Sequence, residues 1–84
     1  MRLDENAIYR TRGKTEVGLV VCRLITGHKR FNILVEYQPA NGMQTYANTQ
    51  FELVDWRGYV FGAKEPHARD LTQFIEYNEE TYYQ

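Results

Sequence analysis

The sequence predicts a mainly β fold, a small five-stranded barrel followed by a C-terminal α-helix, in one domain of 84 residues. Short segments rich in β-branched and aromatic residues recur over about residues 6–61, and turn residues separate them, which is typical of a β-meander. From about residue 66 onward, the apolar residues instead follow helical spacing.

The bulk composition is that of a folded protein outside the membrane. Hydrophobic residues make up 43% of the chain and aromatic residues 14%, which argues against disorder. No apolar segment approaches the roughly 18 residues of a membrane span. The N-terminus lacks an apolar signal core, and Cys22 is the only cysteine. We therefore expect a cytoplasmic protein with no membrane partner.

The strands are expected in quick succession, and the first hairpin register follows from its turn. The predicted strands are residues 6–12, 16–25, 30–37, 43–48 and 51–56. A turn centred on Gly27-His28 sets Val20 opposite Val35. The residues expected on one buried face are Val20, Cys22, Leu24, Phe31, Ile33 and Val35. The opposite face carries a smaller apolar stripe of Leu19, Val21 and Leu34, which needs a cover.

The segment over about 66–78 is expected to supply that cover as a helix. Pro66 suits the first helical position. Ala68, Leu71, Phe74 and Ile75 then follow helical spacing. We expect this helix to pack on the outer stripe or across the mouth of the barrel, with a short acidic and aromatic tail over 79–84.

The pattern "VGLVVCRL…FNILVEYQPANGMQTYANTQFELVD", within residues 7–56, resembles the layout of small SH3-like barrels such as the Tudor and KOW families. The shared features are a second strand that contains glycine and a closing strand that ends on a hydrophobic residue. The resemblance implies an SH3-like barrel, and an architecture of this kind does not fix a function.

The residues predict no enzyme chemistry, no cofactor and no metal. The chain has no serine, which excludes a serine triad. Cys22 falls in the most apolar strand, on the face that is expected to be buried, which is typical of a structural cysteine and not of a nucleophile. His28 and His67 do not stand at metal-ligand spacing from Cys22. We therefore expect a protein that is not an enzyme.

The charges are unevenly spread although the net charge is only −1. Residues 1–64 are net basic and residues 65–84 are net acidic. One basic group, with Arg10 and Arg12, surrounds the first loop, and a second lies at the other end of the meander. This separation disfavours a surface that tracks duplex DNA, which needs a line of phosphate contacts. The second group is a candidate patch for single-stranded nucleic acid: Arg23, His28, Lys29 and Arg30.

Two aromatic groups admit two interpretations each. A two-residue Asn41-Gly42 turn places Tyr37 opposite Tyr46, and a four-residue loop places Tyr46 opposite Val35. A three-residue loop with a bulge would turn Tyr46 to the other face of the sheet. In the first two cases, the rings either fill the end of the barrel with their hydroxyls in solvent or form a half-open rim near the first loop. Trp56, Tyr59 and Phe61 similarly either pack against the helix or form an exposed anchor beside Arg57.

Two hypotheses for the function follow. The first is a protein-interaction module, a regulator or inhibitor of the kind found among phage and bacterial accessory proteins, that docks on a larger protein. Its expected binding residues are Tyr9, Arg10, Arg12, Tyr37, Tyr46, Trp56 and Arg57. The alternative is an SH3-like barrel that binds single-stranded nucleic acid or RNA. The groups that motivate it are Tyr9 with Arg10 and Arg12, and the second basic group. A homodimer formed through edge strands or the apolar stripe is a separate possibility.

Overall fold

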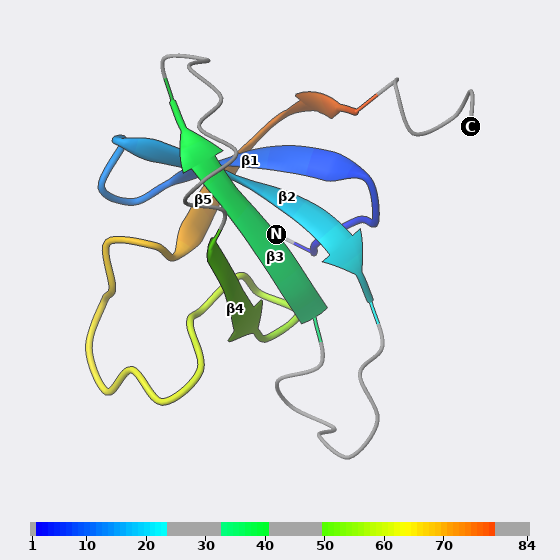
Figure 1. The fold of residues 1–84 in the computed structure, drawn as a ribbon. Coiled ribbons are helices and arrows are strands. Elements are labelled where there is room, and N and C mark those ends of the chain that lie inside the picture. The colour runs from blue at the N-terminus through cyan, green and yellow to red at the C-terminus, as the bar shows by residue number, and fades with distance from the viewer. Residues whose placement is uncertain (1, 24–32, 41–49, 79–84) are drawn as a thin grey trace.

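A computed structural model of the protein describes residues 2–23, 33–40 and 50–78, and these residues form one five-stranded antiparallel sheet without any helix (Figure 1). The strand order is β4-β3-β2-β1-β5. The strands are β1 (Ala7–Thr11), β2 (Glu16–Cys22), β3 (Ile33–Pro39), β4 (Gln50–Val54) and β5 (Leu71–Tyr77). The mainly β class is therefore confirmed. The predicted strand over 43–48 lies outside the described residues.

The hairpin of β2 and β3 has the predicted register through its central part, where Val20 lies opposite Val35. Beyond Val20 a β-bulge places Cys22 opposite Leu34 instead of Ile33. A bulge inserts one extra residue into a strand and so changes the side to which the following residues point. Cys22 is half-buried, and its predicted place on the buried face is wrong for this reason. Leu24 and Phe31 lie outside the described residues.

The strand that pairs with β3 does so in neither of the two registers predicted for an Asn-Gly hairpin without a bulge. Tyr37 lies opposite Gln50, and Val35 lies opposite Glu52. Tyr46, the predicted partner, lies outside the described residues. The registers differ because β3 ends at Pro39 and its partner β4 begins at Gln50, so the connection is much longer than a hairpin turn.

The predicted helix over about 66–78 is wrong, because Leu71–Tyr77 forms β5 and pairs with β1. Two register shifts interrupt this pairing. Leu71, Phe74 and Tyr77 lie opposite Thr11, Tyr9 and Ala7, respectively. The extra residues at the two irregularities give the residues of β5 that lie opposite the buried residues of β1 a spacing of three, which imitates the spacing of a helix face, although only Leu71 among them is buried.

Without a helix, the outer stripe of Leu19, Val21 and Leu34 stays half-buried in the described structure. In the described residues, no helix is present that could cross a membrane.

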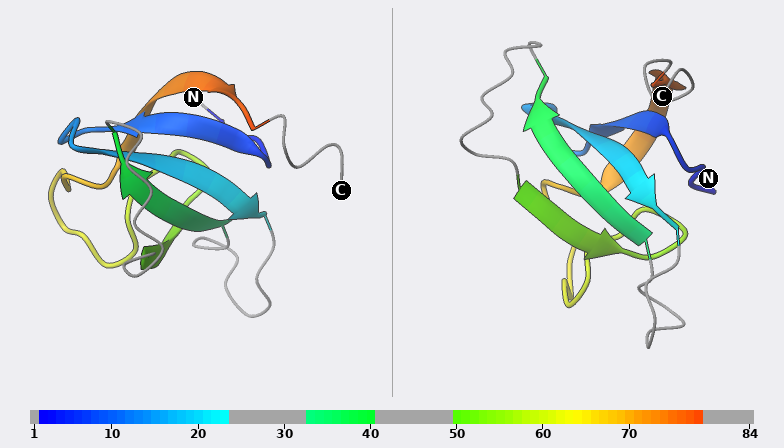
Figure 2. Two further views of the ribbon diagram at one scale, coloured as in Figure 1. Left: turned by 45° about the horizontal axis from the view of Figure 1, so that its top comes forward. Right: turned by 45° about the vertical axis from the view of Figure 1, so that its right-hand side comes forward.

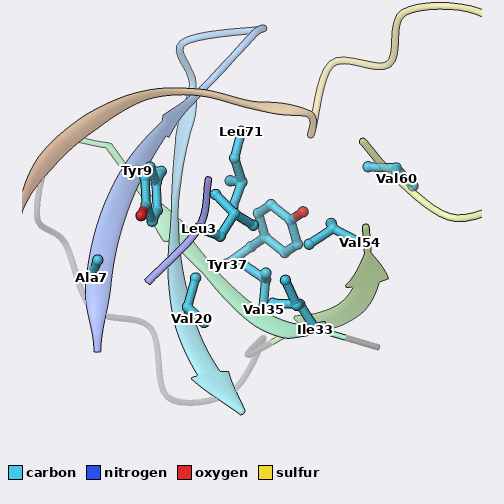
Figure 3. Close-up of a cluster of buried hydrophobic side chains, with 10 residues drawn as sticks. All are labelled: Leu3, Ala7, Tyr9, Val20, Ile33, Val35, Tyr37, Val54, Val60 and Leu71. Atoms are coloured by element: carbon cyan, nitrogen blue, oxygen red, sulfur yellow. The ribbon is translucent and has the colours of Figure 1, made fainter. Parts of the chain in front are cut away.

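The sheet is curved (Figure 2). The core fills its inner side (Figure 3). It receives side chains from all five strands and from the segments that precede β1 and follow β4. Its members are Leu3, Ala7, Tyr9, Val20, Ile33, Val35, Tyr37, Val54, Val60 and Leu71. Gly18 lies in the centre of β2, where a Cβ would stand 2.5 Å from Leu71 Cδ2 and 2.7 Å from Val35 Cγ1. The side chains of Leu71 and Val35 thus occupy the space in which a side chain at position 18 would lie.

The residues that follow β4 turn back along its free edge. Val60 forms a bridge with Val54, and the N–H of Phe61 donates to the carbonyl of Leu53 at 2.9 Å. The N–H of Leu71 then donates to the carbonyl of Gly58 at 2.9 Å. This bond ties the beginning of β5 to the turn that follows β4.

The contact between Gly58 and β5 yields a prediction about stability. Gly58 and Gly62 both have positive φ, 93° and 77°. A Cβ on Gly58 would lie 2.6 Å from the carbonyl oxygen of Leu71, whereas a Cβ on Gly62 would meet nothing within 4 Å. Both alanine variants incur the left-handed strain of about 1–2 kcal/mol, but only Gly58→Ala adds an overpacking cost of about 1–3 kcal/mol.

We expect Gly58→Ala to lose at least about 1 kcal/mol more free energy of unfolding than Gly62→Ala. Urea unfolding followed by tryptophan fluorescence measures both variants. Equal losses would contradict the close contact between Gly58 and Leu71.

Candidate functional site

The turn that follows β4 is fixed by the buried carboxylate of Asp55. The N–H of Gly58 donates to the Asp55 carbonyl at 2.9 Å, which closes a four-residue turn. The Asp55 side chain is only 2% exposed. Its Oδ1 accepts hydrogen bonds from the N–H groups of Arg57 at 2.9 Å and Tyr59 at 3.0 Å. The backbone of the turn is therefore held from its inner side.

The same carboxylate orients Arg57 between two aromatic rings. Nε and Nη2 of Arg57 donate to Asp55 Oδ2 at 3.3 Å and 3.0 Å. The guanidinium carbon lies 4.7 Å from the centroid of the Tyr59 ring and 5.8 Å from that of the Trp56 ring, within the range of cation–π contacts. Trp56 is 53% exposed and Tyr59 is 45% exposed. We call Trp56, Arg57 and Tyr59 the aromatic turn.

A second buried carboxylate, Asp70, holds the other end of the connection between β4 and β5. Its Oδ1 accepts from the N–H of Val60 and its Oδ2 from the N–H of His67, both at 2.9 Å. Nε of Arg12, directly after β1, donates to the same Oδ2 at 3.3 Å, and Nη2 of Arg12 forms an ion pair with that oxygen at 3.2 Å. The Asp70 side chain is 3% exposed and that of Arg12 is 41% exposed. Arg12 is thus held by the buried Asp70, while part of its side chain is exposed to solvent.

A cavity of about 280 Å³ lies beside the aromatic turn. Tyr59 and Arg12 both line it, together with Lys64, Glu65 and Pro66. The exposed aromatic surface therefore continues into a hollow that contains two cationic side chains and one exposed acidic side chain.

Tyr37 lies in the core and does not form an open rim. Its ring is buried as the first interpretation predicts, but its hydroxyl bonds to a backbone carbonyl instead of reaching solvent. It is 3% exposed, and its hydroxyl donates to the carbonyl of Arg69 at 2.9 Å. The Arg69 guanidinium lies 5.0 Å from the centroid of the Tyr37 ring. Burial raises the pKa of Tyr37 far above its usual value, and the negative charge of Glu52 raises that pKa further.

Arg69 holds Tyr37 in place by bridging β2 and β4. Its guanidinium pairs with Glu16 at 3.1 Å and Glu52 at 3.2 Å, and it donates to the side chain of Gln50. Burial alone would lower the pKa of Arg69, but the hydrogen bonds and charges of the two glutamates outweigh it and raise that pKa.

Tyr9 is also buried and so does not contribute to an open rim around the first loop. Its hydroxyl accepts from the N–H of Asp4 at 2.8 Å, and its ring meets Phe74 edge-on at 5.8 Å. Burial raises the pKa of Tyr9. Arg10 alternates with Tyr9 along β1 and so lies on the other face of the sheet. The structure thus separates Tyr9 and Arg10 from the aromatic turn.

Of the predicted binding residues, the structure brings Trp56 and Arg57 together. It places Arg12 in the lining of the cavity that Tyr59 of the aromatic turn also lines. The alternative basic patch is represented only by Arg23 in the described residues. Arg23 Nη2 donates to the carbonyl of Leu3 at 2.9 Å. His28, Lys29 and Arg30 lie outside the described residues, so the nucleic-acid patch stays a prediction.

Sequence reasoning missed the two aspartates that build this surface. Asp55 had a signal, because Asp at the first position and Gly at the fourth, as in Asp55–Gly58, are typical of a type I turn. Asp70 had none that identifies Arg12 as its partner, because 58 residues of sequence separate the two.

Comparison with known proteins gives no family model, no curated protein and no solved structure that matches this sequence. Within residues 2–23, 33–40 and 50–78, no group of three His, Cys, Asp or Glu side chains could hold a metal ion. The candidate site is therefore argued from its own geometry.

The burial of Tyr37 predicts how stability depends on alkaline pH. The folded state keeps Tyr37 protonated at pH values where the unfolded chain, with a tyrosine pKa near 10.0, ionises. The stabilisation is complete below about pH 10 and is lost as the pH rises above it, by up to about 1.4 kcal/mol for each pH unit.

We expect Tyr37→Phe to lose about 1 kcal/mol at pH 7, with the hydrogen bond to Arg69, and to show a shallower decline of the free energy of unfolding above pH 10. Urea unfolding between pH 7 and 11 measures both effects. Tyr59→Phe, which removes an exposed hydroxyl, is the control at pH 7, where its stability should change by less than about 0.5 kcal/mol. A decline for Tyr37→Phe as steep as that of the natural chain would contradict this account.

Proposed function

We propose that this protein is a non-enzymatic protein-interaction module that docks on a larger protein through the aromatic turn. The observation that carries the proposal is that Trp56 and Tyr59 stay exposed while a buried carboxylate fixes the backbone and the arginine between them. A regulator or inhibitor of a larger partner, such as a phage or bacterial accessory protein, fits this role.

The composition of the aromatic turn supports binding to protein. Trp, Tyr and Arg are the residues that most often dominate the binding energy of protein interfaces. A rigid surface also loses less conformational freedom on binding, which favours affinity. Asp55 supplies this rigidity, because it bonds both to the backbone and to the guanidinium of the turn.

The proposed architecture is a partly open SH3-like barrel. The return of β5 to the side of β1 and the hydrogen bond from Leu71 to Gly58 support this class, because they bring the last strand close to the turn after β4. In such a barrel, the connection between β4 and β5 lies outside the sheet and is free to carry a binding surface, as loops often do.

The proposal predicts that single substitutions in the aromatic turn abolish binding without unfolding the protein. In a pulldown from lysate of the source cells, the natural chain should retain a stoichiometric protein partner. Trp56→Ala and Arg57→Ala should each weaken this retention at least about tenfold, as expected for residues that contribute about 2 kcal/mol at an interface. Quantitative mass spectrometry of the bound fraction measures the loss.

Phe51→Ala is the matched control, because Phe51 is 52% exposed but belongs to β4 and not to the turn. It should leave binding unchanged. Circular dichroism must show all variants folded. Retention of nucleic acid alone, or equal effects of Phe51→Ala and Trp56→Ala, would contradict the proposal.

A further inference from the structure

We propose that the cavity beside the aromatic turn receives the carboxylate of an Asp or Glu side chain from the partner protein, while a neighbouring apolar side chain of the partner packs on Tyr59 and Trp56. This inference rests on the proposed function and adds the chemistry of the segment that is recognised. Arg12 is the residue that would bind the carboxylate.

The hydrogen bonds of Arg12 leave donors available on its outer side. Its Nε donates a hydrogen bond to Asp70 Oδ2, and its Nη2 forms an ion pair with the same oxygen. In the described part of the chain, Nη1 of Arg12 donates to no acceptor. Arginine presents its donors in a fixed planar fork that matches a carboxylate. The buried Asp70 therefore holds the guanidinium so that its remaining donors can meet a second carboxylate.

Arg57 repeats this arrangement on the other side of Tyr59. It also binds its buried aspartate through Nε and Nη2 to a single oxygen. Its Nη1 likewise has no acceptor within residues 2–23, 33–40 and 50–78. Tyr59 thus touches one anchored arginine with its ring and shares a cavity with the other. An apolar side chain on this ring would lie next to the carboxylate bound by Arg12.

The size and lining of the cavity suit a side chain. Its volume of about 280 Å³ lies at the lower end of the sizes of about 300–1,000 Å³ that are typical of ligand sites. Pro66 and Ala63 supply apolar wall next to the charged groups. A short acidic side chain with its apolar neighbour matches this combination.

The balance of charge favours a peptide over a nucleic acid. Three cations surround the site, Arg12, Arg57 and Lys64, and three acidic groups accompany them: Asp55, Asp70 and Glu65. A polyanion binds through a net positive field that releases counterions, and this surface has no such excess. A single carboxylate instead gains from directed, charge-assisted hydrogen bonds.

The test is a selection of random twelve-residue peptides displayed on phage against the full chain. The enriched peptides should share one Asp or Glu beside an apolar residue. Trp56 is the only tryptophan of the chain and lies in the site, so its fluorescence reports the binding of synthetic peptides that lack tryptophan. Replacing the acidic residue of a selected peptide with its amide should raise the Kd about 10–100-fold, as expected when a charged hydrogen bond is lost.

A double-mutant cycle locates the carboxylate. Arg12→Gln should raise the Kd of the acidic peptide by a similar factor. In this variant, replacing the acidic residue of the peptide with its amide should raise the Kd little further. Arg10→Gln, on the other face of β1, is the control and should bind like the natural chain. Because Arg12→Gln deprives the buried Asp70 of a charged partner, Arg12→Lys is a second variant that keeps the charge and loses the fork. The change in the peptide tests the inference without altering the protein.

Selected peptides that lose affinity with Trp56→Ala but not with the amide replacement would overturn this inference while supporting the aromatic turn as a binding surface. A selection without any acidic preference would also overturn it, as would tight binding of a single-stranded oligonucleotide that Arg12→Gln abolishes.

Discussion

Two buried carboxylates hold the connection between β4 and β5, and the exposed surface depends on them. This connection has few ladder bonds, so its N–H groups need other acceptors. Asp55 and Asp70 each accept from two such groups. A buried carboxylate is costly without a partner charge, and Arg57 and Arg12 supply it. The need to satisfy backbone groups away from the sheet thus also fixes two arginines at the surface.

The same arrangement explains why this surface is suited to recognition. An arginine anchored from behind keeps a defined orientation, and the rings of Trp56 and Tyr59 are held beside one such arginine. Binding a partner then requires little further ordering of the surface, which favours affinity. The core has a different role, because Tyr9 and Tyr37 are buried and bonded to backbone groups of Asp4 and Arg69. The described aromatic residues therefore include a buried group, to which Tyr9 and Tyr37 belong, and an exposed group, to which Trp56 and Tyr59 belong.

Several elements of the fold could be read from the sequence, and two of the failures have a common cause. The pairing of Val20 with Val35 was predictable because alternation along two neighbouring strands fixes which residues share a face. The positions of Cys22 and of Leu71–Tyr77 were not, because a β-bulge changes the period locally. In β5 the irregularities give a spacing of three residues, which sequence periodicity assigns to a helix.

The sequence by itself determined the β class, the central register of the first hairpin and the cluster of Trp56 with Arg57. These depend on residues close in the chain, whose spacing carries the information. Only the tertiary structure decided which aromatic residues are covered, since Tyr37 is enclosed by Arg69 and Tyr9 meets Phe74, both distant in sequence. It also decided that Arg12 meets Asp70. A contact between residues so far apart produces no periodic pattern in the sequence, because the path of the intervening chain brings the two residues together.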